Sequence, residues 1–298
     1  MDTRITDNRY GASTHDLGRF EDPVLVCGGA FSNLQALSAL LEAARALSIP
    51  ARRIIHTGDV IAYCADPVET AELLRAAQLH AIQGNVEESL SASEPDCHCG
   101  FDTDSLCDRL SAEWFAYADA RIGDELRQWM SRLPHHLTFE MSGLRARVVH
   151  GGVSQINRFI FASHPDGEFE AELAAADADM IIAGHSGLPF TRRVGARVWH
   201  NSGPLGLPAN DATPRVWFSV LTPVENRVRI THHALDYDFE TARAKMIKAG
   251  LCSGYADTLR TGLWPSLDVL PQAERKQSAT PLDLSQPVLV QSAAPVSG

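Results

Sequence analysis

The sequence predicts an α/β fold in which helices cover the faces of β-sheets in layers. Short runs of apolar and β-branched residues alternate with helical patterns along the chain, which is the order expected of such a fold. Several of these runs lead directly into a Gly-Asp, Gly-Asn or Gly-His pair, as polar residues do at the carboxyl end of a buried strand. The 298 residues, of which 45% are hydrophobic, suffice for one sizeable core.

The first predicted elements form two strand–helix units. Residues 24–27 form an apolar strand, a glycine turn follows, and residues 33–47 place leucines on one face of a helix. The pattern repeats with a strand at 53–56 and a helix at 67–77, which begins with a proline. Residues 80–83 form the next strand. Strands and helices that alternate at this spacing predict a sheet with helices packed on it.

The rest of the chain adds a loop, further helices and a second group of strands. From Ser89 to Cys107 the pattern lapses into a loop, and helical periodicity returns around Trp114 and Trp129. Five later segments are typical of strands, and because they follow one another closely they predict an antiparallel second sheet. These strands are residues 145–150, 180–183, 197–200, 216–221 and 228–232, with helices at 165–176 and 238–250.

One domain is predicted, with a short segment at each end. Residues 1–22 are polar and aperiodic and form an N-terminal arm. Residues 23–270 carry the alternating elements and form the domain. After Pro271 the residues Gln, Ser, Ala and Pro dominate, so residues 271–298 are predicted to be a disordered tail.

Composition and charge exclude several classes of function. A net charge of −11 provides no basic surface for a nucleic acid, so a small-molecule substrate is the expected partner. No apolar run approaches the roughly 20 residues of a membrane span, and no secretory segment follows Met1. Since the six cysteines also do not form a secreted disulfide framework, we expect a cytoplasmic protein; its oligomeric state is left open.

Four polar residues at predicted strand ends form a candidate metal site. Asp59, Asn85 and His185 each follow a glycine just after a strand, and His150 ends a strand. Open α/β sheets bind ligands at this edge. One carboxylate, one amide oxygen and two imidazoles make a mixed oxygen and nitrogen set that suits one divalent ion, Fe, Mn or Zn.

Five short motifs occur in order along the chain: residues 57–63 (TGDVIAY), 84–85 (GN), 149–151 (VHG), 184–190 (GHSGLPF) and 201–206 (NSGPLG). Together they resemble the calcineurin-like metallophosphoesterases, and in particular the compact bacterial branch of that family. The resemblance covers residues 23–237. It implies a four-layer α/β/β/α sandwich that carries a dinuclear metal site for phosphoester hydrolysis.

The resemblance breaks at one of the two metals. The family's first motif has an aspartate and a histidine, and alignment of the residues that follow puts Gly29 and Phe31 in those places. Gly187 stands where the fifth motif has its second histidine. Asp59, which the family shares between both metals, is the sole ligand left to the first, whereas the four candidate ligands complete the second. Because the losses fall on one metal, we expect a degenerate first site and a mononuclear centre.

The usual proton donor of the family is also missing. Val86 stands where a histidine follows the Gly-Asn pair, and its acidic neighbour Glu87 is retained. His200, just before the Asn-Ser-Gly loop, and His98, in the loop after the Gly-Asn motif, are the candidates for this catalytic role. For His200, a structural role at the end of a strand is an equally good interpretation.

Three cysteines cluster in the same loop, Cys97, Cys99 and Cys107. In the fold that the resemblance implies, this loop can reach the metal cleft. Thiolates there can bind a second metal such as a structural zinc, supply a nucleophile or take part in redox chemistry. The alternative is that all three are reduced thiols in a polar loop, because no second pair with the usual zinc spacing follows.

These patterns favour an enzyme, namely a metal-dependent hydrolase or phosphodiesterase that acts on a small phosphoester through one metal. Two alternatives stay open. One is an enzyme with a single metal, for instance iron, and chemistry other than phosphoester hydrolysis. The other is a non-catalytic binding protein on the same fold.

Overall fold

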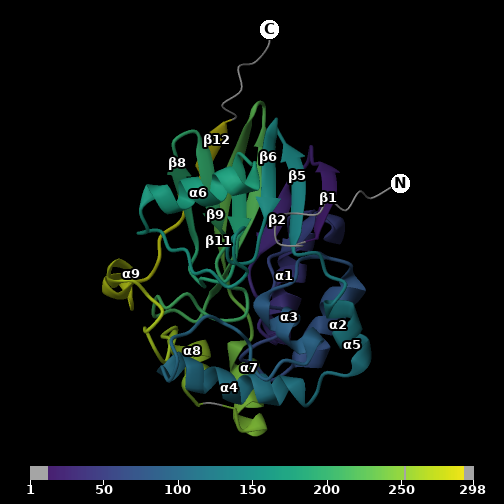
Figure 1. Cartoon of the computed structure of the whole chain (residues 1–298), viewed down its shortest axis with the longest axis vertical. Coiled ribbons are helices and arrows are strands. Elements are labelled where there is room, and N and C mark those ends of the chain that lie inside the picture. Colours follow the sequence, from purple (N-terminus) through teal and green to yellow (C-terminus); the bar gives the residue numbers. More distant parts are fainter. Residues whose placement is uncertain (1–12, 252, 292–298) are drawn as a thin grey trace.

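Two six-stranded β-sheets form the centre of the structure, a computed structural model that describes residues 13–251 and 253–291. The first sheet has the strand order β12-β11-β10-β2-β3-β4, and the second has the order β1-β5-β6-β7-β9-β8. Both sheets mix parallel and antiparallel neighbours. In Figure 1 the strands gather in the upper half of the molecule and most of the helices in the lower half.

The first sheet grows from the strand–helix units that the sequence predicts. Its strands β2, β3 and β4 are parallel neighbours, and β10, β11 and β12 extend it in antiparallel fashion beyond β2. The strands span Val24–Cys27 (β2), Ile54–His56 (β3), His80–Ala81 (β4), Val216–Val224 (β10), Arg227–Leu235 (β11) and Val288–Gln291 (β12).

The second sheet has three parallel strands, β6, β7 and β9, in its middle. β5 pairs antiparallel with β6, and β8 pairs antiparallel with β9. β1 lies at the edge and runs parallel to β5. The strands span Thr14–Arg19 (β1), His136–Met141 (β5), Leu144–Val148 (β6), Met180–Ala183 (β7), Phe190–Val194 (β8) and Arg197–Asn201 (β9).

The side chains of β2 show how the layers are held together. Successive residues of a strand point to opposite faces of the sheet. Val24 and Val26 accordingly join the apolar core between the two sheets, while Leu25 and Cys27 join the core beneath the helices. Helix α6 (Asp166–Ala176) covers the other face of the second sheet. The predicted four-layer α/β/β/α sandwich is therefore confirmed.

The remaining helices pack mainly on the outer face of the first sheet. The first of them begins at a capping residue: the Asn33 side chain accepts a hydrogen bond from the Ala36 N–H at 3.1 Å. They span Leu34–Ala46 (α1), Pro67–Ala77 (α2), Asn85–Ala92 (α3), Leu106–Asp119 (α4), Asp124–Met130 (α5), Phe239–Ala249 (α7), Ser253–Thr261 (α8) and Gln272–Gln277 (α9).

The prediction of an antiparallel second sheet is wrong. Residues 216–221 and 228–232 fall in β10 and β11, which belong to the first sheet. The other three predicted strands form the parallel group β6, β7 and β9 of the second sheet. Parallel neighbours need a long crossover connection, and the segment that contains α6 supplies it between β6 and β7.

The prediction of a disordered tail is wrong for the part that the structure describes. Residues 272–277 form α9, and residues 288–291 form β12, which pairs antiparallel with β11. The apolar Val290 of this strand is buried against the core between the sheets. At the other end of the chain, residues 14–19 of the predicted arm form β1. Residues 1–12 and 292–298 lie outside the described residues.

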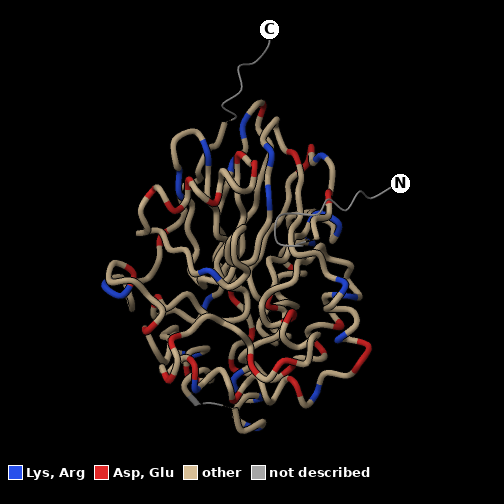
Figure 2. The backbone as a smooth tube through the Cα atoms, in the orientation of Figure 1, with Lys and Arg blue, Asp and Glu red and all other residues tan. Residues whose placement is uncertain are grey.

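Acidic and basic residues are interspersed around the outline of the molecule (Figure 2). In the described parts of the chain, none of the helices combines the length and the hydrophobicity that crossing a membrane requires. The cytoplasmic location stays a prediction.

Candidate metal centre

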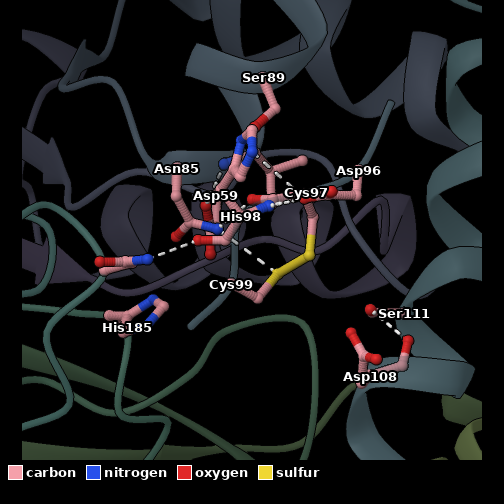
Figure 3. Close-up of a disulfide and its surroundings, with 12 residues drawn as sticks. Asp59, Asn85, Ser89, Asp96, Cys97, His98, Cys99, Asp108, Ser111 and His185 are labelled. Carbon is pink, nitrogen blue, oxygen red and sulfur yellow. Dashed lines mark hydrogen bonds and ion pairs between the residues drawn. A yellow bond between two sulfur atoms is a disulfide. The ribbon is translucent and has the colours of Figure 1, made fainter. Parts of the chain in front are cut away.

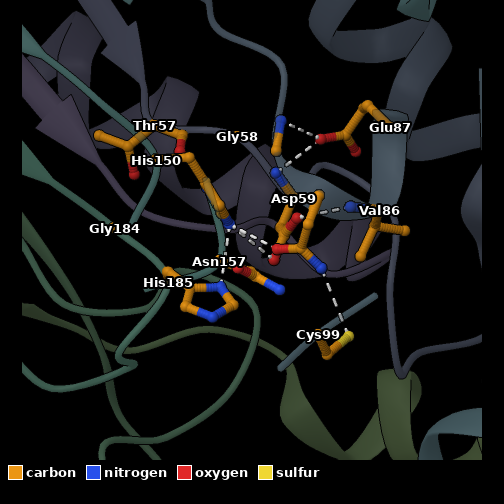
Figure 4. Close-up of polar contacts among 12 residues, drawn as sticks. Thr57, Gly58, Asp59, Val86, Glu87, Cys99, His150, Asn157, Gly184 and His185 are labelled. Atoms are coloured by element: carbon orange, nitrogen blue, oxygen red, sulfur yellow. Dashed lines mark hydrogen bonds and ion pairs between the residues drawn. The ribbon is translucent and has the colours of Figure 1, made fainter. Parts of the chain in front are cut away.

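The four predicted ligands come together at one end of the two sheets. Three of them, Asp59, His150 and His185, are labelled in Figure 4. Asp59 follows β3 and Asn85 follows β4, so the first sheet supplies two of them. His150 follows β6 and His185 follows β7, so the second sheet supplies the other two. All four lie just beyond the carboxyl ends of parallel strands, which is the edge where open sheets bind ligands.

His150 Nε2 lies at the centre of this group. It is 3.0 Å from Asn85 Oδ1, 3.1 Å from His185 Nδ1 and 3.2 Å from Asp59 Oδ2. Ligand atoms of Asp59, His150 and His185 all lie within 4.8 Å of one another. Within the described residues, no other trio of histidine, cysteine or carboxylate side chains converges in this way.

Hydrogen bonds away from this centre orient His150 and Asp59. His150 Nδ1 is 2.7 Å from the Thr57 carbonyl oxygen, an acceptor that holds a proton on Nδ1, so Nε2 is the ring atom that would bind an ion. The Val86 N–H donates to Asp59 Oδ1 at 3.3 Å, which leaves Oδ2 toward the histidines. Both side chains are buried, so their orientation is fixed before any ion binds.

The amide of Asn85 is oriented by the cysteine loop. Its Nδ2 donates to the Cys97 carbonyl oxygen at 2.8 Å and lies 3.4 Å from Cys99 Sγ (Figure 3). Since the amino group faces the loop, Oδ1 faces His150. Cys97 and Cys99 are joined by a disulfide. The loop therefore supports a ligand through a covalently closed turn.

Glu87 connects the loops that carry Asp59 and Asn85 through hydrogen bonds to their backbone. Its carboxylate accepts hydrogen bonds from the N–H groups of Asp59 at 2.7 Å, Gly84 at 3.0 Å and Ile61 at 3.2 Å. Burial, and then the charge of Asp59, raise the pKa of Glu87 to about 7 against the effect of these three donors. Glu87 thus ties the Gly-Asp loop to the start of α3, a structural role that the sequence did not reveal.

Gly84 is required because the two ligand loops approach very closely. A Cβ atom at this position would lie 2.3 Å from Asp59 Oδ1 and 2.5 Å from the Asp59 backbone nitrogen. Asp59 itself has φ +59° and His185 has φ +57°, a left-handed conformation that is uncommon for residues other than glycine and is concentrated at functional sites. The close approach at Gly84 and the two positive φ angles indicate that the backbone conformation of the ligand loops is constrained by the geometry of the site.

The donor set fits a divalent ion. Ligand bonds of about 2.1 Å separate neighbouring donors by roughly 3.0 to 3.4 Å, and the contacts of His150 Nε2 measure 3.0 to 3.2 Å. Burial, and then the proximity of His150, lower the pKa of His185 to about 3, so its imidazole is neutral. A carboxylate oxygen, an amide oxygen and the His185 imidazole nitrogen then surround His150 Nε2. A cation satisfies all of these lone pairs together.

Aromatic side chains lie against the two glycines that the resemblance aligns with ligands of the family's first metal. A Cβ atom on Gly29 would lie 2.2 Å from the Phe31 ring, so the ring occupies the space of a side chain at position 29. A Cβ atom on Gly187 would lie 3.1 Å from the Trp264 ring. Among the described residues Phe159 adds a third ring, which lies against His185 at a tilt of 33° with centroids 4.3 Å apart. The loss of these ligands stays a prediction from the sequence, and the sequence did not indicate the rings beside the two glycines.

His200, one of the two predicted proton donors, lies in the interior of the sandwich rather than among the ligands. It is fully buried on β9, and its Nδ1 lies 2.9 Å from Thr191 Oγ1 on β8. Its ring is 4.9 Å from that of His232 on β11. Burial, and then His232, lower the pKa of His200 well below its ordinary value. This environment fits the structural interpretation.

His98, the second predicted proton donor, faces away from the ligands. Its Nδ1 lies 3.1 Å from Ser89 Oγ, and its Nε2 lies 3.6 Å from Asp96 (Figure 3). The side chain is 54% exposed. The structure therefore brings together the four predicted metal ligands but neither of the two predicted proton donors.

The three clustered cysteines do not form a common thiolate set. Cys97 and Cys99 form a disulfide, and Cys107 is free and buried. In this state the predicted second metal at Cys97, Cys99 and Cys107 lacks two of its thiolates. Cys99 and Cys107 do line the same cavity as Asp59 and His185.

Loss of the disulfide is expected to weaken metal binding. In the double variant Cys97→Ser/Cys99→Ser the loop is no longer covalently closed, so the Asn85 amide loses part of its support. Loss of such a supporting contact costs roughly 10- to 100-fold in metal affinity, and we expect a loss of about tenfold in a competition titration. Cys107→Ser is the control. An unchanged affinity in the double variant would show that Asn85 is positioned without the disulfide.

A four-layer α/β/β/α sandwich with a carboxylate, an amide and two histidines at the junction of its sheets defines the architecture of a metal-dependent phosphoesterase. Residues 16–223 match the calcineurin-like phosphoesterase superfamily domain. The match covers well over half of the 298 residues. The chain belongs to this superfamily.

The alignments with similar proteins cover most of the chain. An uncharacterized protein of Methanocaldococcus jannaschii is 22% identical over 256 residues, which are 80% of this chain and 98% of that protein. The solved structure of a hypothetical protein from Pyrococcus horikoshii has a TM-score of 0.69 at 17% identity, with 81% of this chain and 99% of that chain covered. A metallophosphoesterase from Sphaerobacter thermophilus has a TM-score of 0.64 at 21% identity, with the same coverage. At these identities the structures support the fold.

Proposed function

We propose that the protein is a hydrolase that acts on a small phosphoester through a single metal ion. The observation that carries the proposal is the convergence of Asn85, His185 and Asp59 on His150 Nε2 at 3.0 to 3.2 Å. Membership of a family of metal-dependent phosphoesterases supports the reaction type. The rings of Phe31 and Trp264 beside Gly29 and Gly187 support one metal rather than two.

A divalent ion in this set would supply a Lewis acid and lower the pKa of a bound water. The side chains around it define what else the site can do. Asp59, Asn85, His150 and His185 would hold the ion, and Val86, which lines the adjoining cavity, has no proton to give to a leaving group. The proposed enzyme therefore favours phosphoesters whose leaving groups need no protonation.

The test compares substrates that differ in their leaving group. Protein loaded with Mn²⁺ or Zn²⁺ is expected to hold about one equivalent of metal by elemental analysis and to hydrolyse bis-p-nitrophenyl phosphate much faster than a dialkyl phosphate. In Val86→His, a general acid is returned beside the site, and hydrolysis of the alkyl ester should rise at least tenfold or so. Val86→Asn, of similar size but without an acidic proton, is the control.

The possible outcomes separate the alternatives. Two equivalents of metal would contradict a mononuclear centre. One equivalent without hydrolysis of either ester would overturn the proposed reaction and favour a single-metal enzyme of other chemistry. Absence of metal would favour a binding protein on the same fold.

A further inference from the structure

A cavity opens directly beside the candidate metal centre. Asp59 and His185 form one end of it, and aromatic rings from three distant parts of the chain, Phe31, Phe159 and Trp264, line it. Its volume is about 60 Å³. Because Phe31 and Trp264 stand against Gly29 and Gly187, this space adjoins the side of the centre that the family gives to its first metal.

The walls of the cavity are held by contacts of their own. The Phe31 ring packs edge-on against Tyr63, with centroids 5.0 Å apart. Phe159 packs at a tilt against His185, and Trp264 Nε1–H donates to the Pro208 carbonyl oxygen at 2.8 Å. Rings fixed in this way do not need to rearrange to admit a ligand, and a preformed pocket avoids the cost of ordering its walls on binding.

The cavity offers little to an anion. Among the described residues that line it, Asp59 is the sole Asp, Glu, Lys or Arg, and most of the others are aromatic, aliphatic or proline side chains, including Val86, Leu207 and Pro265. A negatively charged group placed in this space would meet Asp59 and would find no lysine or arginine. An apolar group would instead exchange water for carbon atoms, which is favourable.

We infer that this cavity binds an apolar group of a small molecule whose polar head reaches the metal. A water-sized group takes roughly 10 to 15 Å³ of such a volume, so about 60 Å³ accepts roughly four to six non-hydrogen atoms. The inference rests on the proposed function and narrows it: the substrate is a phosphoester that carries a short alkyl group, or the edge of a small ring, beside the phosphorus.

Alkyl hydroxamates test the cavity separately from phosphoester chemistry, because the hydroxamate head binds a metal without any phosphoryl group. Zn²⁺-loaded protein is titrated calorimetrically with acetohydroxamate and with pentanohydroxamate, which has three more methylenes. If the chain enters the cavity, pentanohydroxamate should bind roughly 50-fold more tightly. Equal affinities for the two probes, or no binding of either to the metal-loaded protein, would overturn the inference.

Two tryptophan variants assign the effect to the cavity wall. Trp264→Ala removes a wall, and the preference for the longer chain is expected to fall below about fivefold. Trp129→Ala is the matched control, since Trp129 is half-buried on α5 and does not line the cavity. A full preference retained in Trp264→Ala would contradict this cavity as the binding site. Phosphoester hydrolysis is measured on the same samples, so chain preference without hydrolysis would refute the proposed reaction and leave the cavity assignment standing.

Discussion

Alanine at position 150 is expected to abolish metal binding. His150 Nε2 is the atom on which Asn85, His185 and Asp59 converge, so its loss removes the central donor and leaves the other three without a common partner. The loss of a ligand should exceed the roughly 10- to 100-fold that follows loss of a supporting contact. Elemental analysis of His150→Ala should find less than about a tenth of the wild-type metal, and turnover should vanish with it.

His136→Ala is the matched control for this experiment. His136 is a buried histidine on β5 and is not among the converging ligands. Its replacement should leave the metal content unchanged, while circular dichroism verifies that both variants are folded. A His150→Ala protein that retains a full equivalent of metal would refute this site, because the ion would then be bound elsewhere.

The second large effect is expected at Glu87, on the stability of the fold. The Glu87 carboxylate is fully buried and accepts three backbone hydrogen bonds, from Asp59, Ile61 and Gly84. Alanine would leave these three N–H groups without a partner inside the protein, and each buried unpaired donor costs about 1 to 3 kcal/mol. We expect Glu87→Ala to lower the free energy of unfolding by about 4 kcal/mol, measured in urea.

The neighbouring residue provides the control. Glu88 is exposed and makes a 3.9 Å ion pair with His135, so Glu88→Ala should change stability by less than about 1 kcal/mol. Glu87→Gln keeps one acceptor oxygen but turns an amino group toward the donors. Its decrease in the free energy of unfolding should lie between those of Glu87→Ala and Glu88→Ala. Equal stabilities of Glu87→Ala and Glu88→Ala would show that water replaces the carboxylate at no cost.

The ligands could be predicted from the sequence because each one sits in a local pattern. A short apolar run followed by a glycine pair places Asp59, Asn85 and His185 at strand ends, and parallel strands bring such ends to one edge. The layers could be predicted for the same reason, from alternating strands and helices. The sheet to which β10 and β11 belong could not, because strand pairing depends on contacts between distant segments.

The walls of the cavity could not be predicted either, because they too depend on contacts between segments that are distant in the sequence. Gly29 and Gly187 are visible as departures from the family pattern, and Phe31 is only two residues from Gly29. Trp264 lies far along the chain from Gly187, and no periodicity links them, so their contact appears only in the folded structure. The cysteine loop shows a comparable limit. The sequence left zinc binding, nucleophilic or redox chemistry and reduced thiols open, and spacing alone did not predict the disulfide between Cys97 and Cys99.

The four candidate ligands come from two different sheets, and this affects the stability of the whole fold. Asp59 and Asn85 follow strands of one sheet, whereas His150 and His185 follow strands of the other. An ion bound by all four therefore links the two halves of the sandwich, and an unfolded chain offers no such set. By mass action, free metal at 100 times its dissociation constant would add about 2.7 kcal/mol to the free energy of unfolding. The folded population then depends on the concentration of available metal.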